Sequence, residues 1–353
     1  METKLGQIPC SVKEFVGTVF LLREDRIERI RQLGFGSLLS MKEVNMRKSL
    51  LRSIIECYDP AEERVTFWSG VSFSVSPHDV HIIMGLQNRG NLVEIDKNIN
   101  PQDVPDKYKY RYNDDGIHMG DLKEIMYKGP IDEDFDRSFV MYLMGTILAP
   151  VCRIRIPICY YSVVRDVSQI TNLNWNEFTL RFIREDIANL KAGLYPNRWP
   201  HGNLAILQYI YWEKVRPWGS NFSYFGREPP LVKYWDEVTA TKRDIYEMSY
   251  GCPSRMVVDD LKIKPSIDNI RSDILQNHMS TPASMVASSS VQFAEITNRL
   301  SSIDKNLVRC LEGEFNINDG PSTSNDRPRR HQNEDDRKSV ADRVTERKRM
   351  RNN

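Results

Sequence analysis

The chain has 353 residues, of which 40% are hydrophobic and 10% aromatic, so it can bury one large core or two modest ones. Its 49 Lys and Arg side chains nearly balance its 48 Asp and Glu side chains, and the average charge therefore points to no class of partner. The longest uncharged apolar run, residues 139–152, has 14 residues and falls short of the ~20 that a membrane-spanning helix needs.

Two helices are predicted near the start of the chain. Residues 24–33 carry apolar side chains every three or four positions, which predicts a helix that Gly34 ends. Residues 44–57 repeat the pattern. Pro60 would stop this second helix because its ring lacks an N–H and restricts the residue before it.

A β hairpin and a capped helix are predicted next. Apolar side chains alternate over residues 65–75 on both sides of Ser69 and Gly70, as in two short antiparallel strands. Ser76 is a good helix cap, with Pro77 at the first helical position and Asp79 at the third. This helix would bury Val80, Ile83 and Met84 and would end at Gly85.

Helical patterns dominate the rest of the folded region. Residues 88–115 are polar and rich in turn residues, which predicts an exposed loop, and residues 217–235 predict an aromatic-rich ordered connection. Further helices are predicted over residues 119–128, 134–148, 175–191 and 203–214. The third has one apolar stripe, made of Trp175, Phe178, Phe182, Ile187 and Leu190.

The composition changes near residue 265. Residues 266–290 are rich in Ser and poor in aromatic side chains, which predicts a linker that cannot bury enough apolar area to stay folded. Residues 291–312 predict an amphipathic helix with a coiled-coil-like seam of about three heptads, through which two copies of the chain would pair. The seam consists of Phe293, Ile296, Leu300, Ile303 and Leu307, followed by Cys310.

The last segment, residues 313–353, predicts a disordered basic tail. Residues 321–353 contain 10 Lys and Arg side chains against 6 Asp and Glu, a net charge of +4. Clusters of this length in a flexible segment suit nuclear-import receptors, and they also suit weak, salt-sensitive contacts with nucleic-acid phosphates. The candidate import residues are Arg327, Arg329, Arg330, Arg337, Lys338, Arg347, Lys348, Arg349 and Arg351.

The order of these motifs resembles the plant mobile domain, also called the aminotransferase-like domain of transposon-derived plant proteins. The resemblance covers residues 29–215. It rests on residues 34–39, 58–60, 77–80 and 84–86, on the helix of residues 139–150, and on residues 174–175 and 202–204. It implies a mainly helical protein of mobile-element ancestry, in a family whose members often work in the nucleus, with the cytoplasm as the alternative location. It implies no particular reaction.

Candidate chemistry in the folded region is weak. Gly34 and Gly36 are too closely spaced for a phosphate-binding loop and follow a helix rather than a strand, so we expect a tight turn and no pyridoxal phosphate. His201, Asp236 and Cys252 stand in a plausible order for a cysteine hydrolase, but without a recognisable protease signature around the cysteine.

Metal binding and base stacking are also disfavoured. His78 and His81 share one turn of helix but lack two further ligands, and Cys152 and Cys159 match no common zinc spacing. We therefore expect no metal and no cofactor. A separate set of aromatic side chains lies mostly at core spacing rather than among basic residues: Trp199, Tyr209, Tyr211, Trp212 and Trp218.

The six scattered cysteines, and a chain start without an apolar signal-peptide core, favour a reducing intracellular compartment. We therefore expect a mainly α protein: a multi-helix globular domain (10–265) with one or two small β hairpins, a linker (266–290), a heptad helix (291–312) and a basic tail (313–353). The expected function is non-enzymatic. The protein would bind protein or chromatin partners in the nucleus, without a membrane, and self-associate through residues 291–312. A nucleic-acid-binding module and a cysteine hydrolase are the alternatives.

Overall fold

The computed structural model describes residues 6–108, 116–151, 154–195, 197–217, 224, 227–250 and 255–261. The chain divides into two units, Met1–Ile267 and Asp268–Asn353, and every described residue belongs to the first. The predicted linker, heptad helix and basic tail lie outside the described residues. Among the described residues, no helix has the length and apolar content that crossing a membrane requires.

The N-terminal part contains three α-helices, α1 (Val12–Phe20), α2 (Glu24–Gln32) and α3 (Lys48–Cys57). The prediction for α2 is confirmed: Gly34 follows it with a φ of 88°, and the chain then enters a 3₁₀ helix, Gly36–Ser40. The two glycines thus belong to a turn between helical elements, as the sequence indicated. Helix α1 was not predicted.

Helix α3 begins four residues later than the sequence indicated. The backbone N–H of Asn45 donates to the Glu237 carboxylate, and that of Arg47 donates to the side-chain oxygen of Gln208, both at 2.7 Å. These partners lie more than 160 residues away in the chain. The backbone N–H groups of Asn45 and Arg47 thus have hydrogen-bond partners outside the helix. These contacts hold the segment before Lys48 in an extended conformation.

The predicted hairpin and capped helix are both confirmed. Strands β1 (Tyr58–Asp59), β2 (Arg64–Thr66) and β3 (Ser72–Ser74) form an antiparallel sheet in that order, with Val65 opposite Phe73. In helix α4 (Pro77–Met84), Ser76 and Asp79 form a reciprocal capping box. Gly85 ends the helix in the left-handed conformation, with a φ of 70°.

The loop after α4 is less exposed than the sequence indicated. It contains two 3₁₀ turns, Pro101–Asp103 and Asp106–Tyr108, and leads to strand β4 (Gly116–His118) and helix α5 (Met119–Lys128). Four of its side chains are buried in the core: Val93, Ile99, Val104 and Tyr108. Most of the other described residues of this loop are exposed, as predicted, and the four buried side chains were missed because they follow no periodic pattern.

The central part of the chain supplies much of the core. Helix α6 (Glu133–Leu143) continues into one π-helical turn, Met144–Leu148, and every residue from Ser138 to Leu148 is buried. Short elements follow: β5 (Arg155–Pro157), the 3₁₀ turns Ile158–Tyr160 and Val167–Asn172, and α7 (Tyr161–Val164) between them. Helix α8 (Trp175–Lys191) has the predicted bounds and buries Trp175, Phe178, Ile187 and also Ile183, while Phe182 and Leu190 of the predicted stripe are half-buried.

The last described elements are two helices, two short strands and a 3₁₀ turn. Helix α9 (Leu204–Lys214) is buried along its whole length and follows the cap Asn203, close to the prediction. Strand β6 (Val215–Pro217), a 3₁₀ turn (Leu231–Tyr234), helix α10 (Glu237–Tyr250) and strand β7 (Arg255–Val257) come next. Helix α10 was not predicted.

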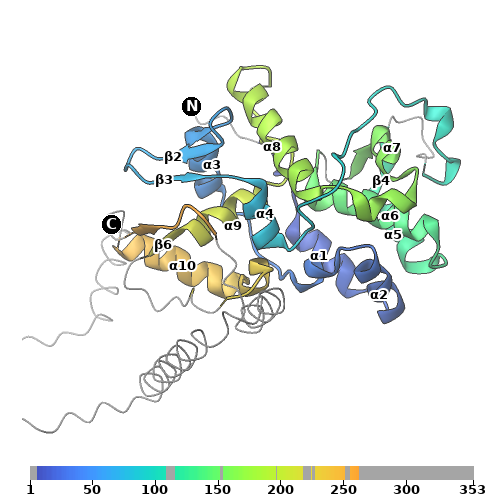
Figure 1. Ribbon diagram of the computed structural model, residues 1–353, viewed down its shortest axis with the longest axis horizontal. Coiled ribbons are helices and arrows are strands. Elements are labelled where there is room, and N and C mark those ends of the chain that lie inside the picture. Colours follow the sequence, from blue (N-terminus) through green and yellow to red (C-terminus); the bar gives the residue numbers. More distant parts are fainter. Residues whose placement is uncertain are drawn as a thin grey trace, which may run out of the picture. The chain divides into compact units, whose positions relative to one another are not determined.

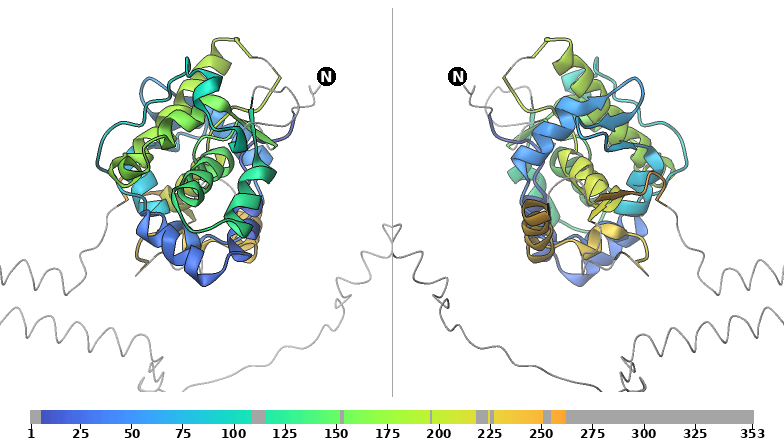
Figure 2. Two further views of the ribbon diagram at one scale, coloured as in Figure 1. Left: turned by 90° about the vertical axis from the view of Figure 1, so that its right-hand side faces the viewer. Right: turned by 90° about the vertical axis from the view of Figure 1, so that its left-hand side faces the viewer.

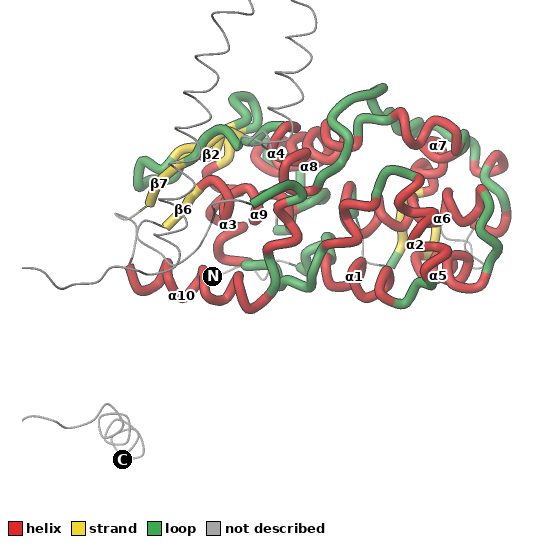
Figure 3. The backbone as a smooth tube through the Cα atoms, turned by 60° about the horizontal axis from the view of Figure 1, so that its bottom comes forward, coloured by secondary structure: helices red, strands yellow, loops and turns green. Residues whose placement is uncertain are grey.

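Figure 1 places α5, α6, α7 and β4 together, whereas α3, α9, α10 and the β2–β3 hairpin lie away from them. In the two opposite views of Figure 2, α6 and α9 are each surrounded by other elements of the unit. The strands form three small antiparallel sheets, β1–β2–β3, β4–β5 and β6–β7 (Figure 3). The predicted fold class, mainly α with small β elements, is confirmed. However, the β4–β5 and β6–β7 pairs join distant segments and are not hairpins.

Candidate functional site

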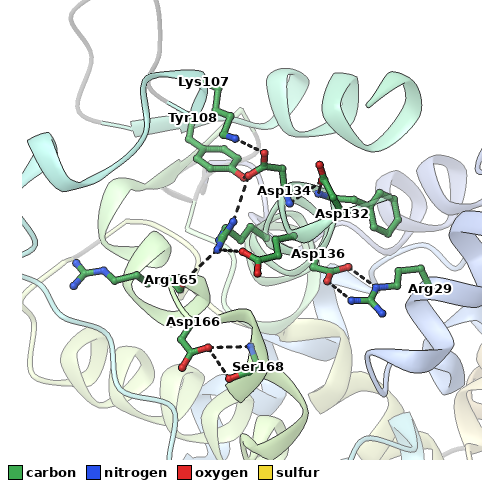
Figure 4. A network of polar contacts seen from close by, with 12 residues as sticks. Arg29, Lys107, Tyr108, Asp132, Asp134, Asp136, Arg165, Asp166 and Ser168 are labelled. Carbon is green, nitrogen blue, oxygen red and sulfur yellow. Dashed lines mark hydrogen bonds and ion pairs between the residues drawn. The ribbon is translucent and has the colours of Figure 1, made fainter. Parts of the chain in front are cut away.

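Charged side chains gather at the N-terminus of α6 (Figure 4). Asp132 caps the helix, since its carboxylate accepts hydrogen bonds from the backbone N–H groups of Asp134 and Phe135 at 2.9 and 3.2 Å. The Asp134 carboxylate accepts a hydrogen bond from the Tyr108 hydroxyl at 2.9 Å and pairs with Lys107. Negative charge at this end is favourable because it faces the positive end of the helix dipole.

The same cluster fastens α2 to α6. The Arg29 guanidinium donates two hydrogen bonds to the buried Asp136 carboxylate, at 2.8 and 2.5 Å, in the bidentate geometry that is strong for this pair. Burial, together with the neighbouring Asp134, raises the pKa of Tyr108, so its hydroxyl stays protonated as a donor. These carboxylates serve as internal anchors for a loop and a helix.

A buried ion pair joins α4 to the C-terminal end of α9. The Lys214 ammonium lies 2.8 Å from an Asp79 carboxylate oxygen and also donates to the backbone and side-chain oxygens of Ser74 at 3.0 and 3.1 Å. The same Asp79 oxygen accepts from the backbone N–H of Ser76 at 2.8 Å. Both charged side chains are almost completely buried, so each depends on the other.

The neighbouring Glu213 is buried in a similar way. Its carboxylate accepts hydrogen bonds from Arg227 at 2.9 Å and from the indole N–H of Trp235 at 2.6 Å. Burial raises the pKa of Glu213, against the lowering effect of Arg227. The Arg227 guanidinium lies 4.8 Å from the ring centre of Tyr224 and 5.1 Å from that of Tyr234, within cation–π range. This cluster holds residues 227–235 against α9.

The histidine of the predicted hydrolase has a different acidic neighbour. The His201 imidazole lies 3.7 Å from the Asp186 carboxylate, and Asp186 also accepts from Arg198 at 2.8 Å. Burial lowers the pKa of His201, although Asp186 acts in the opposite direction. Asp236 instead caps α10 through the Thr239 N–H and faces Lys42. Cys252 lies outside the described residues.

The aromatic and histidine side chains considered above have structural partners. Trp199, Tyr209, Tyr211 and Trp212 are buried, which confirms their assignment to the core, and Trp218 lies outside the described residues. The imidazole of His78 lies 3.0 Å from the Leu261 carbonyl oxygen, and that of His81 contacts the Leu86 carbonyl. Within the described ranges, no group of three or more His, Cys, Asp or Glu side chains is arranged to hold a metal ion.

An open hollow of about 680 Å³ lies where α3 ends and the first sheet begins. We call it the Trp68 hollow after the side chain at the tip of the β2–β3 hairpin, which is 99% exposed. Its lining comes from α3, the hairpin and the end of α8: Glu56, Cys57, Tyr58, Asp59, Pro60, Glu62, Arg64, Thr66, Phe67, Trp68 and Lys191. Trp68 was not among the residues predicted to be functional, although a tryptophan beside a Ser-Gly turn is a signal for an exposed aromatic side chain.

Helix α10 presents a second exposed feature, the α10 stripe. It consists of Val238, Ile245 and Met248, whose exposed fractions are 64%, 53% and 78%. These positions are seven and three residues apart, so they share one side of the helix. The opposite side is buried through Ala240 and Arg243. The cap at Asp236 and this spacing were the sequence signals for α10, which its many charged residues obscured.

The residues assigned to self-association and to nuclear import lie outside the described residues. The first set runs from Phe293 to Leu307 and the second from Arg327 to Arg351. Both assignments remain predictions from the sequence.

Comparison with known proteins gives one match. A model of the family described as Domain of unknown function (DUF8566) matches residues 8–208, more than half of the chain. Neither a curated protein nor a solved structure matches the chain. The match ends inside α9, so Glu213, Lys214 and the α10 stripe lie beyond it. The chain therefore belongs to the DUF8566 family.

Proposed function

We propose that this protein is a non-enzymatic interaction protein of the nucleus, of mobile-element origin, which binds a protein or chromatin partner through its helical unit. The resemblance of residues 29–215 to the plant mobile domain motivates the origin and the compartment. The non-enzymatic part rests on how the described clusters use their ionisable groups. The carboxylates around α6 already bind neighbouring side chains and backbone groups, and Asp79 already binds Lys214. A substrate would have to displace these partners before it could contact the carboxylates.

The α10 stripe is the observation that carries the proposal. Val238, Ile245 and Met248 expose more than half of their surface, on a helix whose other side is fixed. Arg243, which is completely buried, donates to the Val215 carbonyl at 2.6 Å, and Arg47 binds Glu237 and Asp244 at 2.9 and 2.8 Å. An apolar row on a rigidly held helix is the geometry with which helices dock into a partner's groove.

Replacing Val238 and Met248 by Glu should release the partner. Burial of one such side chain contributes about 1.5–3 kcal/mol, so two carboxylates in the contact should weaken binding at least about tenfold. A fluorescent fusion of the full chain in living cells should then recover faster after photobleaching than the parent fusion. Because both side chains are exposed in the free protein, the thermal midpoint of the purified variant should stay within about 2 °C of the parent.

The matched control adds two carboxylates elsewhere on the surface, by Gln32→Glu and Gln102→Glu, at exposed positions away from α10. This control should recover at the rate of the parent. The α10 surface would be rejected as a binding site if the Val238 and Met248 variant recovered as slowly as the parent, or if the control recovered as fast as the variant.

The nuclear part of the proposal has its own test. A fusion that lacks residues 321–353 should lose its enrichment in the nucleus, because the basic clusters that an import receptor would bind are removed. The ratio of nuclear to cytoplasmic fluorescence measures this. A fusion large enough to be excluded from passive diffusion is needed, and unchanged enrichment would show that the tail is not the import signal.

A further inference from the structure

The Trp68 hollow has an excess of negative charge. Three carboxylates line it, from Glu56, Asp59 and Glu62, against the two cations of Arg64 and Lys191. One of these cations is already compensated from outside the lining, since Arg64 binds Asp259 at 2.8 Å. The hollow therefore favours a cationic occupant and disfavours a phosphate.

Two of the three carboxylates remain available. Asp59 accepts from the backbone N–H groups of Ala61 and Glu62 at 2.9 and 3.2 Å, which fixes the turn between β1 and β2. In the described part of the chain, neither Glu56 nor Glu62 has an ion-pair partner through its side chain. The Lys191 ammonium donates to the backbone carbonyl of Glu56 at 2.9 Å rather than to its carboxylate.

Trp68 adds an aromatic surface to these charges. The next residue inward, Phe67, packs against Phe73 and Tyr211, with ring centres 6.3 and 5.8 Å apart, and thereby anchors the tip of the hairpin. Trp68 itself is 99% exposed. Among aromatic side chains, tryptophan binds cations best, and an arginine guanidinium both stacks on its face and pairs with carboxylates in two-point geometry.

Tyr58 gives a further, weaker indication. Its side chain lines the hollow, and its buried hydroxyl has no hydrogen-bond partner in the described part of the chain. A buried polar group without a partner is costly, so an occupant that drew this side chain toward its N–H donors would supply the missing hydrogen bond.

We propose that the Trp68 hollow binds an arginine-rich segment of a partner protein. One guanidinium of this segment stacks on Trp68, and others pair with Glu56 and Glu62. This site lies on a different element from the α10 stripe, so either binding surface can fail without the other.

The test measures binding of a fluorescein-labelled peptide of alternating Arg and Ser to the full-length protein by fluorescence anisotropy, at low and moderate salt. Trp68→Ala should weaken binding about threefold to thirtyfold, the range expected for loss of a cation–π contact. Glu56→Gln combined with Glu62→Gln should weaken binding similarly and should also reduce its salt dependence. Bound peptide should slow alkylation of Cys57, a half-buried thiol in the lining, as measured by mass spectrometry.

Two control variants separate the hollow from general surface effects. Phe20→Ala removes an aromatic side chain that is 85% exposed elsewhere, and Glu124→Gln with Glu185→Gln removes two exposed carboxylates elsewhere. Both should bind the peptide as the parent does. Equal weakening by the paired Glu controls, or unchanged binding by a folded Trp68→Ala protein, would overturn the proposal. Tighter binding of a single-stranded DNA oligomer than of the peptide, lost with Trp68, would assign the hollow to nucleic acid instead and would equally overturn it.

Discussion

Replacing Lys214 by Met should lower the free energy of unfolding by about 3–5 kcal/mol, the usual cost of leaving a buried charge without its partner. The ammonium is the hydrogen-bonding partner of Asp79 and of two Ser74 oxygens, and only 1% of the Lys214 side chain is exposed. Methionine fills a similar volume and provides no charge. Asp79 would then remain buried with only the Ser76 contacts of its capping box. Chemical denaturation followed by circular dichroism measures the loss.

Three further variants decide whether the pairing is responsible: Lys128→Met, Asp79→Asn, and Asp79→Asn combined with Lys214→Met. Lys128→Met breaks an exposed pair with Glu124 and should change stability by no more than about 1 kcal/mol. The double variant Asp79→Asn with Lys214→Met removes both charges, and it should lose less than the sum of the two single losses because the uncompensated charge is gone. A loss below about 1 kcal/mol for Lys214→Met alone would show that water or rearrangement compensates Asp79, contrary to the geometry.

This ion pair also bears on how the family domain is built in this chain. Asp79 lies within the matched residues 8–208, whereas Lys214 lies just beyond them, on the same continuous helix α9. Glu213, at the adjacent position, binds Arg227 and Trp235 from the segment that leads to α10. The described residues between 209 and 250 should therefore unfold together with the matched part rather than as a separable module.

Local chemistry was sufficient to predict several elements. Ser76, Pro77, Asp79 and Gly85 mark both ends of α4 with side chains that act within one helical turn, so no distant contact is needed to place it. Helix α8 was placed correctly because its apolar stripe is long enough to stand out. The β2–β3 hairpin has a tight turn between alternating strands, which is also a local signal.

Other features depend on partners that are distant in the sequence. The delayed start of α3 results from contacts with Gln208 and Glu237. The apolar pattern of residues 44–57 cannot predict these contacts, because both partners are distant in the sequence. Glu213 and Lys214 resemble the polar end of a surface helix. In the fold both are buried, because Arg227 pairs with Glu213 and Asp79 pairs with Lys214. Sequence periodicity predicts which side of a helix is apolar, and it does not predict which charges the tertiary fold will enclose.

The candidate surfaces were missed for a related reason. Met248 is a large apolar side chain of a kind that usually enters a core, and its exposure becomes evident only when the neighbouring positions of α10 have filled that core. At the hairpin tip, Phe67 takes the inward position and Trp68 the outward one. The alternation over residues 65–75 therefore held a signal for the exposure of Trp68, whereas composition alone could not have placed the exposed stripe of α10.

Replacing Gly202 by Ala should destabilise the protein by about 2–5 kcal/mol, adding roughly 1–2 kcal/mol for a left-handed backbone to an overpacking cost of about 1–3 kcal/mol. Gly202 has a φ of 97°, and a Cβ atom there would lie 2.9 Å from the Cβ and 3.0 Å from the Cα of Ile183. The backbone of α8 cannot easily move away, because Ile183 is buried in the core. The Gly202 N–H also donates to the Pro150 carbonyl at 2.8 Å, so the glycine fixes the approach of three segments just before α9 begins.

The same chemical change should have the opposite sign at Gly17. This glycine lies inside α1, where an added Cβ would meet no atom within 4 Å, and Ala should stabilise the helix by about 0.5–1 kcal/mol. Measuring both variants in one denaturation series allows a direct comparison, and the gap between them reports the left-handed backbone at Gly202 together with its contact with Ile183. Equal effects at the two positions would mean that α8 and the residues before α9 are not packed as closely as these distances require, and the placement of α9 against α8 would then have to be revised.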